Sequence, residues 1–267
     1  MRKVVIGMSA GVLIVLLIIS FAVVKKRSYE DISSTEPASL LIQAKQARAQ
    51  GELLEAKRKF EQALENIHDL RKIEEIQKIL EEMNMGILFS PVIDECSTEY
   101  VVKPRDNLVN IAKAHHTTVG LLMKSNKLTS NVIHPGQILK VIKCPFSLVI
   151  DKSQNLLFLK RKGEIIKTYV ISTGENNSTP VGVFKIVIKL INPTWFKTGA
   201  VIPPDSPENI LGTRWMGLDI EGYGIHGTRE PEKLGQHVTS GCIRMSNEDV
   251  EELYGIVPMG TKVVIVD

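Results

Sequence analysis

The most restrictive feature of the sequence is an uncharged run of 21 residues at positions 4–24. At 1.5 Å per residue, a helix of this length spans about 30 Å, the thickness of the hydrocarbon core of a bilayer. A helix inside a soluble domain is seldom apolar on every face. We therefore expect residues 1–27 to form a single transmembrane signal-anchor, with basic residues on both of its flanks.

A cleaved secretory signal is the alternative for this segment. Ser20-Phe21-Ala22 offers a small-x-small cleavage site, but the apolar stretch is long for a signal peptide. Cations lie on both sides of the run, so the positive-inside rule does not set its orientation. The orientation must be inferred from the function of the remaining residues.

Composition excludes several classes of protein. The hydrophobic fraction of 43% and the charged fraction of 24% are those of an ordinary globular protein. A net charge of +3 is too small to indicate nucleic-acid binding. The three cysteines show no C-x-x-C spacing and so form no metal-type pair. The sequence implies no metal and no organic cofactor.

Residues 36–85 show the periodicity of helices. Leu53, Ala56, Phe60 and Ala63 recur at steps of three and four and therefore share one helix face. The stretch at 44–65 resembles a single tetratricopeptide-type (TPR) unit, although about three repeats are normally needed for stability. We expect a helical spacer, with a dimerising bundle or a dock for a partner protein as alternatives. A linker is expected at 86–98.

Residues 99–143 are predicted to fold in the order strand, helix, helix, strand. A strand begins near Tyr100, and Asp106 or Asn107 can cap a helix that starts near Leu108. Thr117 or Thr118 can cap the second helix. A Pro135-Gly136 turn leads into a final strand at 138–142.

This segment resembles a LysM domain over nearly its whole length. The resemblance implies binding of polymers that contain N-acetylglucosamine, such as peptidoglycan, in a groove between two loops. Two positions depart from the usual pattern: Arg105 stands where Gly is typical, and Asn107 where Thr is typical. Carried over to this sequence, the groove residues are Pro104, Arg105, Asp106, Asn107, Asn131, Val132 and Ile133.

Cys96 and Cys144 flank this segment. If its two strands pair antiparallel, both cysteines lie at the same end of the ladder, where they can form a disulfide bond. Such a bond closes a loop of roughly 50 residues and adds up to about 4 kcal/mol of stability. Two separate thiols are the alternative.

Residues 146–267 are predicted to be mainly β-structure. A hairpin or meander is expected at 147–173, because apolar residues alternate on both sides of Lys162-Gly163. Further strands are expected at 182–190, 215–219 and 262–266. Ser246 can cap a helix at 247–254. Glycines and prolines between 193 and 224 indicate long loops, where substrate clefts are common.

The run from 222 to 245 carries the chemistry. His226 precedes Cys242 by 16 residues across a turn-rich stretch, and a cysteine becomes a good nucleophile when a nearby imidazole takes its proton. The Gly227 carbonyl can accept the other ring N–H. The Gly241 and Cys242 amides can stabilise an oxyanion, and Arg244 can pair with a substrate carboxylate.

A family resemblance supports this interpretation. The segments TPVGVFKI (179–186), NILGTRWMGL (209–218), IHGT (225–228) and SGCIRM (240–245) are similar to the catalytic domain of YkuD-type L,D-transpeptidases. The resemblance implies an all-β, sandwich-like domain and thiol acyl transfer. Cys242 is then the nucleophile, His226 the base, Gly227 its carbonyl partner, and Arg244 the substrate-orienting cation.

Several positions near the site need separate comment. Thr239 stands where the family often has Ser, and we expect it to polarise the site. Ser240 stands where many members have His. His237 is expected to be a surface residue. Trp195 and Trp215 are expected to pack in the core, with a place in the cleft as the alternative.

The resemblance implies a specific reaction. Cys242 attacks the amide between the L-centre of a diamino acid and the terminal D-alanine of a tetrapeptide stem, and an amine of a second stem then receives the acyl group in a 3→3 cross-link. Three alternatives stay open: an L,D-carboxypeptidase, an acyltransferase that attaches proteins to the wall, and a non-catalytic peptidoglycan-binding protein. Because peptidoglycan lies outside the cell membrane, residues 28–267 are expected to be extracytoplasmic.

Overall fold

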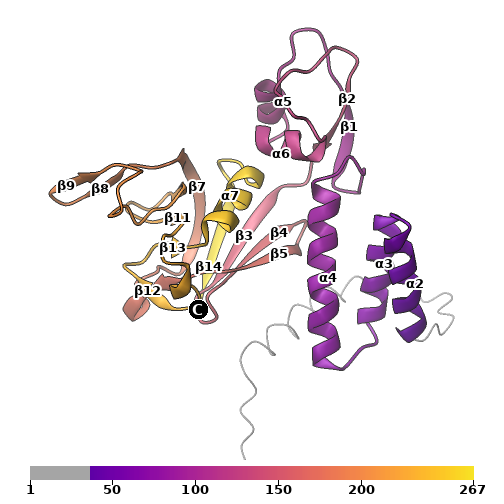
Figure 1. Ribbon diagram of the computed structural model, residues 1–267, viewed down its shortest axis with the longest axis horizontal. Helices are drawn as coiled ribbons and strands as arrows, with labels where there is room; N and C mark the ends of the chain where they lie inside the picture. Colours follow the sequence, from indigo (N-terminus) through magenta and orange to yellow (C-terminus); the bar gives the residue numbers. More distant parts are fainter. Residues whose placement is uncertain (1–36) are drawn as a thin grey trace, which may run out of the picture. The chain divides into compact units, whose positions relative to one another are not determined.

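The computed structural model describes residues 37–267, which form two compact units that divide after Met83. The expected transmembrane segment at 4–24 lies outside the described residues. Within residues 37–267, no helix is both long enough and apolar enough to cross a bilayer. The smaller unit is helical, and the larger unit combines a small βααβ domain with a large sheet (Figure 1).

Three helices make the smaller unit: α2 (Pro37–Ala49), α3 (Leu53–Leu64) and most of α4 (Leu70–Leu88). Alanines bring α2 and α3 close together, and Phe60 fills the space between them; the buried members of this core are Ala44, Ala47, Ala56, Phe60, Ile76 and Met83. Helix α4 continues to Leu88, so the linker expected from residue 86 begins later. A helix tolerates Gly86 when neighbouring turns pack well.

The βααβ order expected for 99–143 is present. Strand β1 (Ser97–Val101) pairs antiparallel with β2 (Ile138–Ile142), and helices α5 (Leu108–Ala114) and α6 (Val119–Ser125) lie between them. The β1 strand begins at Ser97, three residues earlier than expected. Side chains of Asn107 and Thr118 cap the two helices; Asp106 and Thr117 do not.

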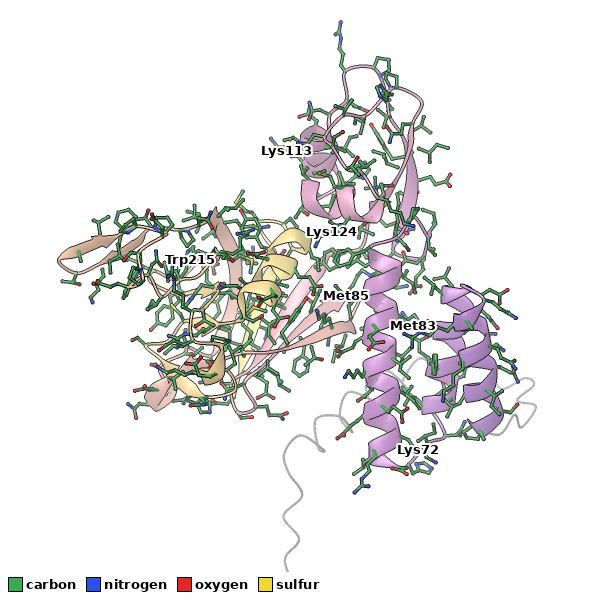
Figure 2. All side chains as sticks on the ribbon, viewed as in Figure 1. Lys72, Met83, Met85, Lys113, Lys124 and Trp215 are labelled. Carbon is green, nitrogen blue, oxygen red and sulfur yellow. A yellow bond between two sulfur atoms is a disulfide. The ribbon has the colours of Figure 1, made fainter. Side chains whose placement is uncertain are left out.

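The antiparallel pairing brings Cys96 and Cys144 together in a disulfide bond, the first of the two alternatives considered above. The βααβ domain also contacts the end of α4. In Figure 2, Lys124 of α6 extends from this domain, and its ammonium lies 4.8 Å from the ring centre of Phe89.

The large sheet has eight strands in the order β13-β11-β10-β7-β14-β3-β4-β5. Its first four by sequence are β3 (Phe146–Asp151), β4 (Leu156–Arg161), β5 (Glu164–Val170) and β7 (Gly182–Ile191). The others are β10 (Arg214–Leu218), β11 (Gly224–His226), β13 (Ile243–Arg244) and β14 (Lys262–Val266). The pairs β3–β14 and β11–β13 are parallel, and the remaining pairs are antiparallel.

Helix α7 (Asn247–Ile256) packs its buried residues Val250, Leu253 and Ile256 into the core beneath this sheet. Ser246 caps it as expected, and accepts the amide of Asp249 at 3.0 Å. Two short pairs complete the domain: β6 (Thr173–Gly174) with β12 (His237–Thr239), and β8 (Trp195–Lys197) with β9 (Ala200–Ile202). The β8–β9 hairpin projects from the sheet in Figure 1.

Candidate active site

The parallel pairing of β11 with β13 determines where the expected catalytic side chains point. Ile225 is opposite Ile243, and His226 is opposite Arg244. Successive side chains of a strand alternate between its two faces. Both isoleucines are fully buried in the core, so His226 and Arg244 share the other face, and Cys242, two residues before Arg244, joins them.

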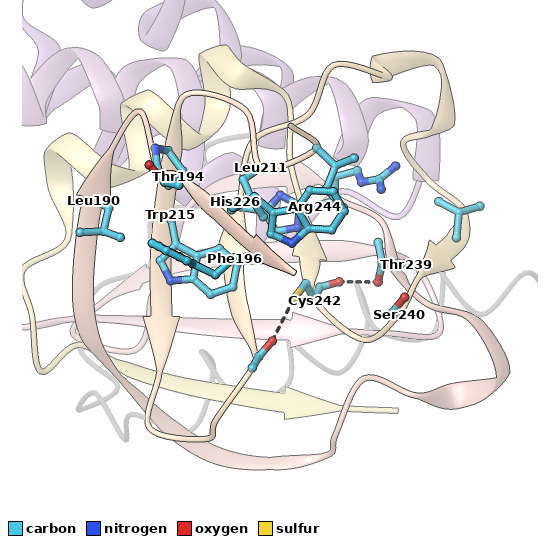
Figure 3. A pocket seen from close by; sticks show the side chains of 15 residues that line it. Leu190, Thr194, Phe196, Leu211, Trp215, His226, Thr239, Ser240, Cys242 and Arg244 are labelled. Atoms are coloured by element: carbon cyan, nitrogen blue, oxygen red, sulfur yellow. Dashed lines mark hydrogen bonds between the residues drawn. The ribbon is translucent and has the colours of Figure 1, made fainter. Parts of the chain in front are cut away.

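These three side chains line one cleft of about 450 Å³. Figure 3 shows Cys242 below His226 and Arg244 in that view, with Trp215 and Phe196 to one side. The other lining residues are mostly apolar; they are Leu190, Pro193, Thr194, Trp195, Ile210, Leu211, Gly222, Val238, Thr239 and Ser240. Trp195 and Trp215 therefore line the cleft, and the expectation that they pack in the core was wrong.

His226 is buried and neutral. Its Nδ1 lies 2.7 Å from the Gly227 carbonyl oxygen, and because a carbonyl only accepts, Nδ1 carries the proton and Nε2 the lone pair. The Trp215 ring stacks on the imidazole with 5.7 Å between ring centres. Burial lowers the pKa of His226 to about 4, and the nearby Arg244 charge acts in the same direction. The imidazole can thus accept a proton through Nε2.

Cys242 is a free cysteine that is partly exposed to the cleft. Its Sγ donates to the carbonyl of Gly222 at 3.4 Å. Burial raises the pKa of the Cys242 thiol, while the amide of Gly224 and the charge of Arg244 oppose that rise. Cys242 and His226 line the same cleft, so the imidazole is available as the base for the thiol.

The turn that presents Cys242 is held by Thr239. Its hydroxyl accepts the Gly241 amide at 3.1 Å and donates to the Cys242 carbonyl at 2.6 Å. The Gly241 amide is thus engaged within the turn, whereas we expected it to stabilise an oxyanion. Thr239 supports the same turn, whereas we expected it to polarise the site. Gly241 has φ +129°, and a Cβ there would lie 2.6 Å from the Tyr223 ring. Only glycine suits this position.

Arg244 supplies the positive charge at the cleft. Its side chain is 7% exposed, and Nη1 donates to Glu230 Oε2 at 3.1 Å. Its Nε is buried without a hydrogen-bond partner in the described part of the chain. Ser240 is exposed at the cleft, and His237 is exposed as expected, although its ring contacts Thr173 at 2.8 Å.

Several contributors to the site were missed at the sequence level. Gly222 and Gly224 contact the thiol through backbone atoms, and Glu230 pairs with Arg244. The side chain of Asn247 holds the segment after His226. Its Nδ2 donates to the Thr228 carbonyl at 2.8 Å, and its Oδ1 accepts the Thr213 N–H at 3.1 Å. The TREPEK run signals a charged loop, but no local pattern signals the other contacts.

The expected glycan groove residues lie on two loops that leave the same end of the β1–β2 pair, because Val101 is opposite Ile138. Arg105 adopts φ +73°, the conformation that explains why Gly is typical there. Asp106 accepts the Tyr100 hydroxyl at 2.7 Å and the Lys103 amide at 2.8 Å. Ile133 packs against the domain core.

Most of the expected groove residues are exposed; they are Pro104, Arg105, Asn107, Asn131 and Val132. Asn107 also uses its side chain as a helix cap. Elsewhere in residues 37–267, no group of three His, Cys, Asp or Glu side chains is arranged to hold a metal ion.

Comparison with known proteins finds two family matches. Residues 145–265 match the YkuD family, described as the L,D-transpeptidase catalytic domain, and residues 100–141 match the LysM domain. YqjB of Bacillus subtilis, which carries the name L,D-transpeptidase, is 38% identical over 45% of this chain and 70% of its own length.

Two further relatives match a larger share of this chain. YkuD of Bacillus licheniformis, also named an L,D-transpeptidase, is 36% identical over 62% of this chain and 97% of its own length. YkuD of Bacillus subtilis is 32% identical over 62% of this chain and 97% of its own length. The matched share of this chain exceeds that of the catalytic domain alone.

Proposed function

The chain belongs to the L,D-transpeptidase family with a YkuD-type catalytic domain, and we propose from this that its donor substrate is a peptidoglycan tetrapeptide stem. The chain is an enzyme of the acyltransferase class, and its LysM domain implies binding of peptidoglycan. One observation supports the proposal most: a neutral, buried imidazole and a thiol share one face of the β11–β13 pair within an apolar cleft.

The first half of the reaction follows from these groups. As Cys242 Sγ attacks the carbonyl carbon between the diamino acid and the terminal D-alanine, its proton passes to His226 Nε2. The resulting oxyanion needs an amide donor, and Cys242 is the remaining member of the expected pair, because Gly241 donates to Thr239. The C–N bond then breaks, the imidazolium protonates the leaving nitrogen, and D-alanine departs from a thioester.

In the second half, an amine of another stem attacks the thioester. Its proton passes to His226, the C–S bond breaks, and the product is a 3→3 cross-link with the thiol restored. Arg244 orients the donor through a carboxylate. Water or an amine on a wall protein would give the carboxypeptidase or the protein-attaching acyltransferase on the same scaffold, because all three acceptors attack one acyl-enzyme.

The proposal extends to the remaining parts of the chain, which would hold the catalytic domain near the wall. We propose that residues 4–24 anchor the chain in the cell membrane, with residues 28–267 extracytoplasmic. Helices α2 to α4 would then act as a TPR-like spacer between membrane and catalytic domain, with a protein partner as a further role for their surface.

The proposal is tested by incubating the purified full-length chain with a disaccharide-free tetrapeptide and following the products by mass spectrometry. We expect release of D-alanine, a covalent adduct on the peptide that contains Cys242, and a dimer of stems. The Cys242→Ser variant should form no adduct. Full activity in that variant would refute the thiol mechanism, and binding without any turnover by the parent would favour the non-catalytic alternative.

A further inference from the structure

The cation at the cleft already has a carboxylate partner supplied by the protein. Arg244 lies on β13, and its side chain in the cleft is 7% exposed. Glu230 is 42% exposed and reaches Arg244 from the loop after β11. The two partners thus differ in burial: the arginine is enclosed, and the glutamate approaches from the solvent side.

The ion pair leaves donor capacity unused. A guanidinium has five N–H donors in a planar fork and is matched best by two carboxylate oxygens. Here Nη1 donates to Glu230 Oε2 at 3.1 Å, while the buried Nε finds no acceptor among the described residues. A buried donor without an acceptor is unfavourable, so a carboxylate that reached both nitrogens would bind better than Glu230 does.

Glu230 also has a second counter-ion. The ammonium of Lys233 lies 2.5 Å from Glu230 Oε1, on the opposite oxygen from the one that meets Arg244. Both residues belong to the same short loop, in which Pro231–Lys233 forms one 3-10 turn. If Glu230 moves away from Arg244, it therefore keeps a positive partner and does not lose its charge compensation.

We propose that Glu230 is an internal competitor for the substrate carboxylate: it occupies Arg244 in the free enzyme, and a carboxylate of the donor stem displaces it onto Lys233. This inference rests on the proposed function, because it assumes that the donor stem places a carboxylate on Arg244. Glu230 acts through Arg244 and is a specificity-determining residue that does not touch the reacting atoms. Competition by Glu230 favours ligands whose carboxylate makes a bidentate contact with the guanidinium of Arg244.

The test compares three variants in steady-state kinetics of D-alanine release. Glu230→Gln removes the competitor, and we expect KM for the tetrapeptide to fall about three- to fivefold with kcat unchanged, the size of an ion pair with one exposed partner. Lys233→Met removes the alternative partner, so Glu230 holds Arg244 more firmly and KM should rise. Glu232→Gln, an exposed carboxylate on the same loop, is the matched control and should leave KM unchanged.

Two substrate changes identify which carboxylate is read. One stem ends in D-alaninamide and so lacks the terminal carboxylate. The other stem has lysine at its third position, where the reference stem has a diamino acid with a second carboxylate, and so lacks that side-chain carboxylate. The stem that lacks the relevant carboxylate should bind equally well to the parent and to Glu230→Gln, whereas the other stem should still distinguish them. Equal effects of Glu230→Gln on every stem would overturn the proposal.

The opposite kinetic pattern would also overturn it. If Glu230 only holds Arg244 in place, Glu230→Gln should raise KM and lower kcat. Binding of the same stems to Cys242→Ser, measured by calorimetry, separates this inference from the proposed function. If the parent binds stems without turning them over, the proposed function is wrong. The affinities of Glu230→Gln and Lys233→Met, each combined with Cys242→Ser, still test whether Glu230 competes with the substrate carboxylate.

Discussion

At the scale of single residues, the site depends on the burial of His226. The imidazole lies under the Trp215 ring and donates to the Gly227 carbonyl. Trp215 reaches this position because residues 217 and 224 are glycines: a Cβ on either would lie within 3.0 Å of the indole. The same packing buries the imidazole, and this burial lowers the pKa of His226.

The first prediction concerns the pH dependence of kcat/KM. Because the pKa of His226 is lowered to about 4, the base stays unprotonated far below the usual histidine range, and activity should persist down to about pH 5. The profile is measured with the tetrapeptide, and binding to Cys242→Ser over the same range controls for titration of the substrate. An acidic limb at pH 6–7 would indicate a different protonation state.

The second prediction is the matching effect on stability. The unfolded chain binds a proton on His226 below pH 6.5, and the folded chain binds it only near pH 4. The free energy of unfolding contributed by this group should therefore fall as pH drops through that window, by an amount on the order of 3 kcal/mol. Denaturation of His226→Gln should show a flatter dependence. Parallel curves for parent and variant would contradict this.

The sequence predicted local residue roles better than distant ones. The sequence predicts Ser246 as a helix cap and narrows the other two caps to neighbouring pairs, Asp106 or Asn107 and Thr117 or Thr118, because a cap contacts amides only two or three residues away. The Cys242–His226 pair was recognised because a family motif joins them. The Gly224 amide and Asn247 were missed, since their contacts depend on how separate strands and loops meet.

At the scale of elements, the LysM domain makes hydrogen bonds both to helix α7 of the catalytic domain and to the end of α4. Thr118 donates to the Gly255 carbonyl at the end of α7. The Lys140 ammonium caps the end of α4, and donates to the Ile87 and Ser90 carbonyls at 2.6 and 3.0 Å. Hydrophobic periodicity predicts each helix, but it does not indicate which helices pack against each other.

The third prediction uses two neighbouring ion pairs at this junction that differ in burial. Asp94–Arg161 and Glu95–Lys162 both have N–O distances of 2.6 Å, but the first pair is 8% and 9% exposed and the second 64% and 49%. Asp94→Ala leaves a buried guanidinium unpaired and should cost about 3–5 kcal/mol. Glu95→Ala should cost less than about 1 kcal/mol.

Urea denaturation of both variants measures this difference. The Glu95 variant serves as the matched control, because it removes a carboxylate one residue away along the same segment. Similar losses of stability in the two variants would mean that burial does not govern the strength of this junction.

At the scale of the whole molecule, the disulfide bond links the linker before β1 to the start of the catalytic domain. Cys96 and Cys144 close a loop of 48 residues in sequence separation, and Cys242 is the remaining free cysteine of the three. Disulfide bonds persist in oxidising compartments, which agrees with the proposed extracytoplasmic location. A structural bond and a reactive thiol thus coexist in one chain.

The fourth prediction is that Cys96→Ser/Cys144→Ser lowers the free energy of unfolding by up to about 4 kcal/mol, because the open loop gains conformational freedom in the unfolded state. Thermal denaturation with and without reductant measures this effect, and the double variant should no longer respond to reductant. Thiol titration of the denatured, unreduced parent should detect one thiol. Three thiols would show that the bond is absent.

The LysM domain cannot simply be deleted to test its role in wall binding. Leu121 of α6 is fully buried in the same hydrophobic cluster as Leu148, Leu253 and Val257 of the catalytic domain. Removing residues 99–143 would therefore expose part of the catalytic core, and any loss of binding could arise from unfolding. A substitution on the exposed groove loop avoids this problem.

The fifth prediction therefore concerns Val132, which is 66% exposed on the loop before β2. Val132→Asp places a charge where an apolar side chain would contact a sugar ring, so pelleting of the protein with purified peptidoglycan should fall severalfold. Release of D-alanine from a glycan-free tetrapeptide should persist, because the catalytic cleft is a separate set of residues. Val109→Asp, at a comparably exposed valine of 64% on α5, is the control for added charge. If both variants pellet like the parent, wall binding resides outside this groove.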